Sequence, residues 1–424
     1  MTLNKFRYID FSFIDKYLNI DISKFYLIEK GQIAYLLFYV AMIFAYFASF
    51  NVWFMWPFKN VYPILTAMLL VVSMLFSNSM QRPIFNRKDF VIPILSCAVI
   101  LFYQALMSES TVIGFILIFF RIFIFWALFR IDKNCFEKFA TVLCKVLSCL
   151  LAVSLAVFVL YLMGFHLPSR NAEFNDWYYY TNYYFFLVSD GVLNEIIPRF
   201  HSVFLEPGHM GTAIVLLLAT QMGKWKKWYN IILIVALLVS FSLAAYGLLT
   251  ILVFLHMWIQ RKKIFLKVVA MVLFIAAVVG GSFVYNGGDN MLNQLIVMRL
   301  EVSDSGDDIE GNNRVSSEFE AEFNSFMQSS DILWGRKMEN TGRGGNAGYR
   351  VYIYSYGLIG FFLCYLFYFV SMYKAPDKRA FIAMMVLSLA NFWVRAYPLW
   401  YGFFIPYYLF AYLSRPLNQI SLKR

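Results

Sequence analysis

Long apolar stretches separated by short polar connectors run through most of this chain. A helix needs about 20 apolar residues to cross the ~30 Å of hydrocarbon in a lipid bilayer. Stretches that approach or reach this length lie at residues 32–50, 61–77, 90–107, 112–130, 139–163, 208–222, 264–285, 351–373, 380–394 and 397–414. The pattern predicts a polytopic membrane protein built from α-helices.

The apolar stretch from Ile231 to Ile259 fits neither one span nor two. A single helix there would be about 43 Å long, which is too long for one ordinary span and short for two. Cytoplasmic connectors carry an excess of Lys and Arg, so the basic clusters decide between the two arrangements. All of them fall on one side if the chain crosses twice between Lys227 and Arg261, as two short helices broken near residues 240–247. The clusters are Arg82/Arg87/Lys88, Arg130/Lys133/Lys138, Lys224/Lys226/Lys227, Arg261/Lys262/Lys263, Lys374/Lys378/Arg379 and Arg415/Lys423/Arg424.

This arrangement predicts about twelve transmembrane helices, cytoplasmic termini and two long external loops. The expected boundaries are a cytoplasmic N-terminal segment (1–31), helices 1–5 (32–163), a first large loop (164–207), helices 6–9 (208–285), a second large loop (286–350), helices 10–12 (351–414) and a cytoplasmic tail (415–424). The second loop is rich in acidic residues, whereas the cytoplasmic connectors are basic, which agrees with the predicted sides.

The composition also indicates a chain that lies in lipid. Of its 424 residues, 61% are hydrophobic and only 14% are charged, against about a quarter charged in a soluble domain. The net charge of +11 comes from basic residues in short connectors, so it indicates orientation in the membrane and no nucleic-acid partner. The five cysteines lie outside the two long loops and form no CxxC pair, so we expect neither a disulfide framework nor a zinc site.

Acidic side chains are missing from all the predicted spans. Ion-coupled transporters usually need an intramembrane carboxylate, so this counts against a coupled transporter but not against a facilitator. A basic residue, Arg121, does lie within a predicted span, near the middle of the sequence IFFRIFIFW. A mid-membrane arginine costs at least ~2.5 kcal/mol on insertion scales and should face the bundle interior. It is either a structural arginine bonded to carbonyls or a ligand for a lipid diphosphate.

A cluster of ionisable residues lies directly before the predicted span at 208–222. The segment PRFHSVFLEPGHMG places Arg199, His201, Glu206 and His209 within eleven residues. Proline and glycine after the glutamate suit a loop-to-helix transition, and Glu206 lies next to the positive end of the helix dipole. The dipole favours an ionised Glu206 that acts as a hydrogen-bond acceptor or a base.

The same segment resembles a known family. Arg199-x-x-Ser202-x-Phe204-x-Glu206-Pro207 is similar to the R-x-x-G-x-F-x-E-P sequence of bacterial O-antigen polymerases (Wzy type). That family belongs to a superfamily that also contains the O-antigen ligases. The glycine of the pattern is Ser202 here.

Further segments strengthen the resemblance. The broken double span with Ser242 and Gly247 is similar to a serine- and glycine-containing segment of the family, and Arg299 and Arg314 are similar to arginines of its second loop. Asp331-Ile-Leu-Trp-Gly335, followed by Tyr356-Gly-Leu-Ile-Gly360, resembles the passage that leads into the next helix. Many ligase relatives carry a His-Asn pair before that helix. Here Gly345-Asn346 lacks the histidine, which favours a polymerase.

The resemblance implies an all-α polytopic protein of the bacterial inner membrane, with about 12 transmembrane helices and two large periplasmic loops. It implies a metal-independent glycosyltransferase without a cofactor, whose active site faces the periplasm. The enzyme would transfer a glycan from an undecaprenyl diphosphate donor to a sugar hydroxyl of another lipid-linked repeat unit. Membrane lipid, a chain-length regulator and a flippase of the same pathway are further expected partners. Two alternatives stay open: an O-antigen ligase that transfers glycan to lipid A-core, and a transporter of lipid-linked sugar or polysaccharide.

Such a transfer needs a base for the attacking hydroxyl and cations for the departing diphosphate. The catalytic candidates are Glu206 as the first choice of base, His201 as the second, and Arg199. Since no cluster has metal-ligand spacing, arginine forks are the expected diphosphate ligands. The substrate-binding candidates are Arg199, Arg299, Arg314, Arg121, His209 and Arg395. The alternative for Glu206 is a purely structural carboxylate that pairs with Arg199.

Aromatic residues crowd the first loop in the tract FNDWYYYTNYYFF, which begins at Phe174. Rings beside amides and carboxylates suit a sugar-binding surface. The simpler interpretation, which we favour, is an interfacial helix whose rings form a membrane belt, with sugar contact left to its polar side.

Overall fold

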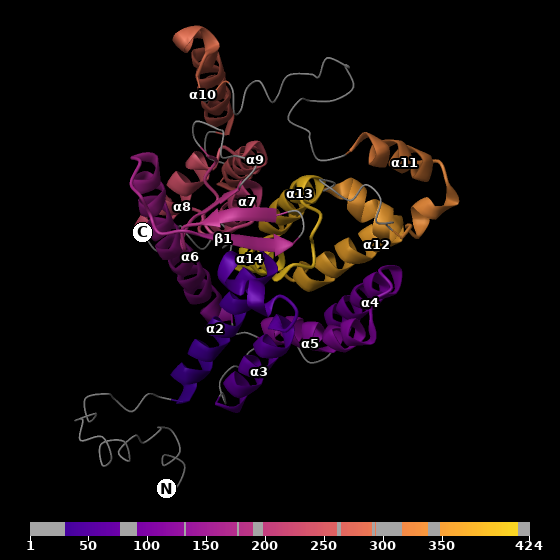
Figure 1. Cartoon of the computed structure of the whole chain (residues 1–424). Coiled ribbons are helices and arrows are strands. Elements are labelled where there is room, and N and C mark those ends of the chain that lie inside the picture. Colours follow the sequence, from indigo (N-terminus) through magenta and orange to yellow (C-terminus); the bar gives the residue numbers. More distant parts are fainter. Residues whose placement is uncertain are drawn as a thin grey trace, which may run out of the picture.

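The computed structural model describes residues 30–76, 91–130, 133–175, 178–189, 198–260, 264–290, 293, 316–337 and 348–413. Within these ranges the protein consists mainly of helices, with one small antiparallel sheet (Figure 1). The α-helices are α2 (Lys30–Ser49), α3 (Tyr62–Leu75), α4 (Val91–Met107), α5 (Val112–Phe129), α6 (Lys133–Leu162), α7 (Pro207–Thr220), α8 (Trp228–Val239), α9 (Leu243–Gln260), α10 (Ile264–Val284), α11 (Ser317–Met327), α12 (Tyr349–Met372), α13 (Lys378–Val394) and α14 (Tyr401–Leu413). The 3-10 helices and strands are η2 (Trp53–Phe58), β1 (Arg170–Asn175), β2 (Tyr178–Asn182), β3 (Leu187–Ser189), η4 (Tyr285–Gly288) and η7 (Ser330–Leu333).

Several of these helices have the length and composition of membrane spans. The described residues contain six that are long and apolar enough to cross a membrane: Gln32–Ser49, Val112–Phe129, Cys135–Leu162, Leu243–Gln260, Val269–Gly288 and Tyr349–Met372. Shorter apolar helices run over Tyr62–Leu75, Val91–Met107, Pro207–Thr220 and Trp228–Val239. The structure therefore supports an all-α membrane protein, whereas the number of twelve spans stays a prediction.

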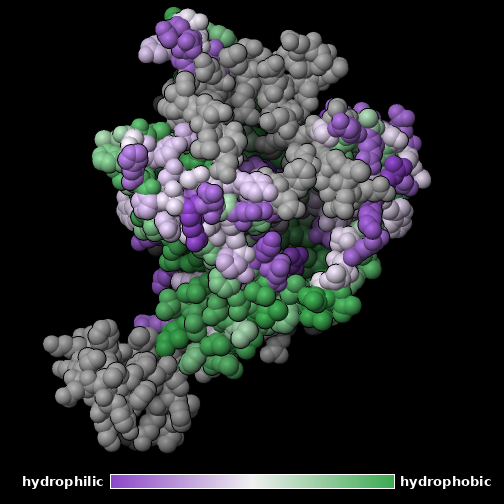
Figure 2. All heavy atoms as spheres, in the orientation of Figure 1, coloured by the Kyte–Doolittle hydropathy of each residue, from purple (hydrophilic) through white to green (hydrophobic). Residues whose placement is uncertain are grey.

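The outer surface agrees with contact with lipid. Leu95 on α4 and Val112 and Phe119 on α5 are 61%, 76% and 63% exposed. Figure 2 shows hydrophobic residues gathered over the part of the surface where α2 to α5 lie, with hydrophilic residues above them. Apolar patches of this extent are rare on soluble monomers and mark a membrane or interaction surface.

Helices α7 and α14 form the centre of the bundle. Every residue of α7 from Gly208 onward is buried, as is every residue of α14 from Tyr401 to Tyr412. Helix α14 packs against α7 and also contacts α2, α6, α12 and α13 (Figure 1). A helix that is apolar all round is typical of a buried position. Helix α7 is therefore covered along its whole length from Gly208 onward, and the partly exposed Glu206 directly precedes it.

The predicted break in the long apolar stretch is confirmed. Helix α8 ends at Val239 and α9 begins at Leu243, and Phe241 between them has a left-handed φ of 44°. The hydroxyl of Ser242 accepts a bond from the backbone N–H of Ala245 at 3.4 Å, which helps to start α9. With 12 residues, α8 is only about 18 Å long, so a separate crossing by each half stays a prediction.

Helix α12 contains a second break, at Gly357. It brings together the two glycine-containing segments noted in the sequence, Asp331–Gly335 and Tyr356–Gly360. Gly357 has φ 61° and ψ −175° inside the helix. The carbonyl of Tyr354 then accepts a bond from the backbone N–H of Arg336 at 2.6 Å, and that of Tyr356 accepts one from the Tyr103 hydroxyl at 2.9 Å. A Cβ on Gly357 would lie 2.3 Å from the Leu333 carbonyl oxygen. The glycine therefore allows η7 to pack directly against the opened helix.

The expectation of an interfacial helix for the aromatic tract is wrong. The described part of that tract completes β1 and forms β2, which pairs antiparallel with β1 on one side and β3 on the other. Along β2, Tyr178 and Tyr180 face inward whereas Tyr179 is exposed, as the two-residue period of a strand requires. This alternation directs alternate tyrosines toward the start of α7.

Candidate functional site

Glu206 lies at the end of α7 where that helix emerges from the centre of the bundle. It occupies the N-cap position in an extended conformation, followed by Pro207 at N1, but its side chain makes no capping hydrogen bond. Instead its Oε2 accepts a bond from Nη2 of Arg395 at 2.5 Å, and its Oε1 accepts one from the Tyr178 hydroxyl at 2.7 Å. Three elements distant in sequence thus meet at one carboxylate: α7, the end of α13 and β2.

Arg395 reaches this carboxylate across the backbone of α7. It follows the last residue of α13, and its backbone N–H donates to the carbonyl of Asn391 at 2.6 Å. A Cβ on Gly208 would lie 2.2 Å from Nη2 of Arg395. The guanidinium can therefore lie against the first turn of α7 only because residue 208 has no side chain.

The guanidinium of Arg395 has hydrogen-bonding capacity left over. Its side chain is 6% exposed, against 34% for Glu206. Its buried Nε has no hydrogen-bond partner among the described residues. Arginine N–H groups bind phosphate oxygens, but Nε has almost no exposed surface, so an anion reaches it only if the groups that cover it move apart.

Electrostatics keep Glu206 ionised. Burial raises the pKa of Glu206, but the charge of Arg395, then that of His209, and the bonds from Arg395 and Tyr178 outweigh it and hold the pKa well below its usual range. Burial, followed by the charge on Glu206, raises the pKa of Tyr178, which therefore stays protonated and donates. A carboxylate with so low a pKa is a strong acceptor but a weak general base.

The two histidines of the segment have different surroundings. The Nδ1–H of His201 donates to the carbonyl of Phe204 at 2.6 Å. Burial lowers the pKa of His201 to about 4, although that bond opposes the shift, so the ring is neutral at pH 7. The buried His209 ring lies 5.7 Å from the ring of Trp400, and its charge acts on Glu206. His209 thus belongs to the same group as Glu206, whereas His201 supports the turn before it.

The remaining candidates have other recorded partners or lie outside the described residues. Arg199 is half-buried, and its charge acts on His201. Arg121 is half-buried on α5 and interacts with tyrosine side chains of the bundle, among them Tyr62 and Tyr401. Arg299 and Arg314 lie outside the described residues.

Sequence reasoning named Glu206 and Arg395 separately but gave no reason to pair them. It missed Tyr178, and it assigned Gly208 only to the loop-to-helix transition. The density of tyrosines in the first loop was a signal for Tyr178, but it did not select one ring from its neighbours. Within the described ranges no group of three or more His, Cys, Asp or Glu side chains could hold a metal ion.

Comparison with known proteins adds no assignment, because no protein-family model, no curated protein and no solved structure matches the chain.

Proposed function

We propose that this chain is a polymerase of O-antigen or a related bacterial surface polysaccharide. It transfers a glycan from an undecaprenyl diphosphate donor to a sugar hydroxyl of another lipid-linked repeat unit, at the periplasmic face of the inner membrane. One observation carries the proposal. Glu206 of the R-x-x-S-x-F-x-E-P segment is paired with a buried arginine whose Nε has no hydrogen-bond partner in the part of the chain that the structure describes. A carboxylate acceptor beside a cation with spare donors is what attack on a diphosphate-linked sugar requires.

The chemistry follows from the charges of these groups. The acceptor hydroxyl oxygen bonds to the anomeric carbon of the donor, the bond from that carbon to the diphosphate breaks, and undecaprenyl diphosphate leaves. When the donor binds, the groups that cover Arg395 move apart and its Nε–H donates to a diphosphate oxygen, with Arg199, Arg299 and Arg314 as further ligands. Glu206 accepts the hydrogen bond from the attacking hydroxyl and then its proton.

Donor binding also makes Glu206 a better base in this proposal. Without the donor, Glu206 is the only anion at Arg395 in this proposal, and the arginine charge lowers the pKa of the carboxylate, which is then a weak base. A diphosphate that shares Arg395 weakens this effect, so the pKa of Glu206 rises toward a range useful for proton transfer. The base is then activated only when the leaving group is in place. Arginines provide the positive charge, so polymer formation should persist in EDTA.

Deletion of the gene tests the reaction class. A polymerase mutant should lose the surface polysaccharide ladder and retain single repeats attached to lipid. Accumulated lipid-linked polymer would instead indicate a ligase, and untranslocated repeats a transporter. Either of those results would overturn the proposal.

Complementation of the deletion strain tests the site. Glu206→Gln and Arg395→Gln should restore membrane protein but not the ladder, and Arg199→Ala and Arg299→Ala should shorten or abolish it. Glu109→Gln is the matched control, because Glu109 forms an ion pair with Lys337 in which both side chains are about two-thirds exposed, and such pairs contribute little. Wild-type ladders from both Glu206→Gln and Arg395→Gln would refute the proposed site.

A further inference from the structure

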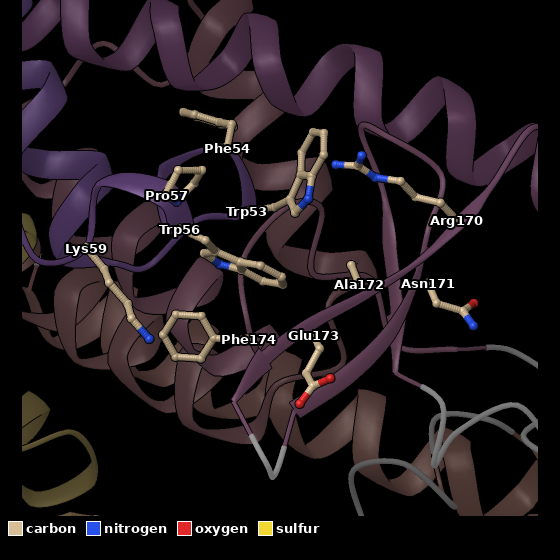
Figure 3. A pocket seen from close by; sticks show the side chains of 10 residues that line it. All are labelled: Trp53, Phe54, Trp56, Pro57, Lys59, Arg170, Asn171, Ala172, Glu173 and Phe174. Carbon is tan, nitrogen blue, oxygen red and sulfur yellow. The ribbon is translucent and has the colours of Figure 1, made fainter.

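An open groove lies between η2 and β1, outside the group around Glu206 (Figure 3). Its volume of about 490 Å³ is within the range of small-molecule binding sites. The rings of Trp53, Trp56 and Phe174 line it. The Trp56 ring is fixed in place, because its Nε1–H donates to the carbonyl of Asn51 at 2.8 Å.

Charged and amide groups surround these rings. Lys59 lies over the ring of Phe174, with Nζ 5.1 Å from the ring centroid, and Arg170 lies over Trp53 at 5.2 Å. Asn171 and Glu173 on β1 complete the polar lining, and both are exposed. Figure 3 shows the aromatic side chains grouped on one side and the polar groups around them.

This combination matches the chemistry of a pyranose. One face of such a ring carries C–H groups that pack on an aromatic ring, while its edge carries hydroxyls that need both donors and acceptors. Glu173 supplies an acceptor that sugar hydroxyls need and that a lipid phosphate cannot use, so the mixed donors and acceptors of the lining favour a sugar over an anionic lipid headgroup. Lys59, Arg170 and Asn171 supply donors.

A continuous path of aromatic rings joins the groove to Glu206. The Phe174 ring lies 5.3 Å from Trp56 and 6.4 Å from Tyr178, whose hydroxyl donates to Glu206. The backbone N–H of Trp53 also donates to the carbonyl of Val203 at 2.8 Å, which ties η2 to the segment that precedes α7.

We propose that the groove between η2 and β1 binds the glycan of a lipid-linked repeat unit, with a sugar face on Trp56 and sugar hydroxyls at Asn171 and Glu173. The inference rests on the proposed function for the identity of the glycan. It assigns the groove a role in holding sugar while Glu206 and Arg395 act at the reacting bond.

The test measures binding separately from turnover. Free repeat oligosaccharide, released from the lipid-linked repeats of the deletion strain, is titrated into purified protein in phosphatidylcholine nanodiscs. Trp56→Ala should weaken binding by about tenfold through loss of the stacking surface, and Glu173→Gln should weaken it about threefold to tenfold through loss of a charged acceptor. Phe58→Ala is the matched control, because Phe58 is a 38% exposed ring of η2 that does not line the groove.

The outcomes separate this inference from the proposed function. Glu206→Gln should abolish polymer formation yet bind oligosaccharide like wild type, and its binding would survive even if wild-type protein made no polymer. Glu173→Gln changes an exposed side chain and keeps the test valid if Trp56→Ala does not fold. Wild-type affinity in the folded groove variants would overturn the proposal. A second pair of results would also overturn it: no oligosaccharide binding in phosphatidylcholine nanodiscs, and protection from unfolding by phosphatidylglycerol in the wild type but not in Trp56→Ala. These results would assign the groove to a lipid headgroup.

Discussion

Replacement of Gly208 by alanine adds one methyl group at the point where Arg395 crosses the first turn of α7. The new Cβ would lie 2.2 Å from Nη2 of Arg395 and 3.0 Å from its Cζ. Non-bonded atoms are most stable at about 3.5 Å or more, so the guanidinium has to retreat by roughly 1.3 Å. A retreat of this size directed away from Glu206 would lengthen the 2.5 Å bond between them to about 3.8 Å, beyond hydrogen-bond reach.

The expected loss follows from the type of bond that breaks. A hydrogen bond to a charged group contributes about 1.5–3 kcal/mol, which corresponds to a rate decrease of about ten- to a hundredfold if the contact is needed in the transition state. The free energy of unfolding should change much less than the rate. The displaced atoms are the far end of a flexible side chain, and alanine favours a helix over glycine by about 1 kcal/mol.

The assay is the initial rate of polymer formation by purified protein in nanodiscs, with lipid-linked repeats from the deletion strain as substrate. Gly247→Ala in α9 is the control, because a Cβ at residue 247 meets no atom within 4 Å. It should retain the wild-type rate, while Gly208→Ala should lose most activity and keep a similar unfolding midpoint. Equal rates for the two folded variants would refute the claim that the Arg395–Glu206 contact is needed.

Three further substitutions test the surroundings of the site. Tyr178→Phe removes the bond to Glu206 but keeps the ring, so polymer formation should fall about five- to thirtyfold with little change in the unfolding midpoint; an unchanged rate would exclude a role for this hydroxyl. The free energy of unfolding of the wild type should fall by on the order of 2 kcal/mol from pH 7 to pH 5. Over this range His201 becomes protonated in the unfolded state but stays neutral in the folded state, where its pKa is about 4. His201→Gln should lose less over the same window, and unfolding midpoints at the two pH values decide this. Gly357→Ala should destabilise by at least about 2 kcal/mol, because a left-handed φ of 61° is strained for alanine and its Cβ would meet the backbone of η7. Gly281→Ala in α10, which meets no atom within 4 Å, should be at least as stable as wild type.

Much of the helical fold could be predicted because hydrocarbon thickness fixes the length of apolar runs. The same constraint made one helix from Ile231 to Ile259, about 43 Å long, doubtful, and the basic clusters on either side then predicted the break between α8 and α9. The first loop could not be predicted in this way. Residues 178–180 are all tyrosine, so the sequence cannot show the two-residue alternation that buries Tyr178 and Tyr180 and exposes Tyr179. The strand pairing that reveals it forms only in the folded chain.

The site was predictable only as far as its local pattern extends. Glu206 was indicated because the motif and the start of α7 are contiguous in sequence. Its partner Arg395 is 189 residues away, and the contact depends on how the end of α13 packs over Gly208. The low pKa of Glu206 follows from this packing, so the sequence could suggest the residue but not whether it is a ready base.

The central claim is that Glu206 and Arg395 together catalyse transfer of a lipid-linked glycan. The most direct measurement is turnover of lipid-linked repeats by the purified protein in nanodiscs, with polymer and released undecaprenyl diphosphate measured in parallel. We predict one undecaprenyl diphosphate released for each new linkage by the wild type, and neither product from Glu206→Gln or Arg395→Gln. Intact single repeats after incubation with folded wild-type protein, or equal turnover by both variants, would contradict the account.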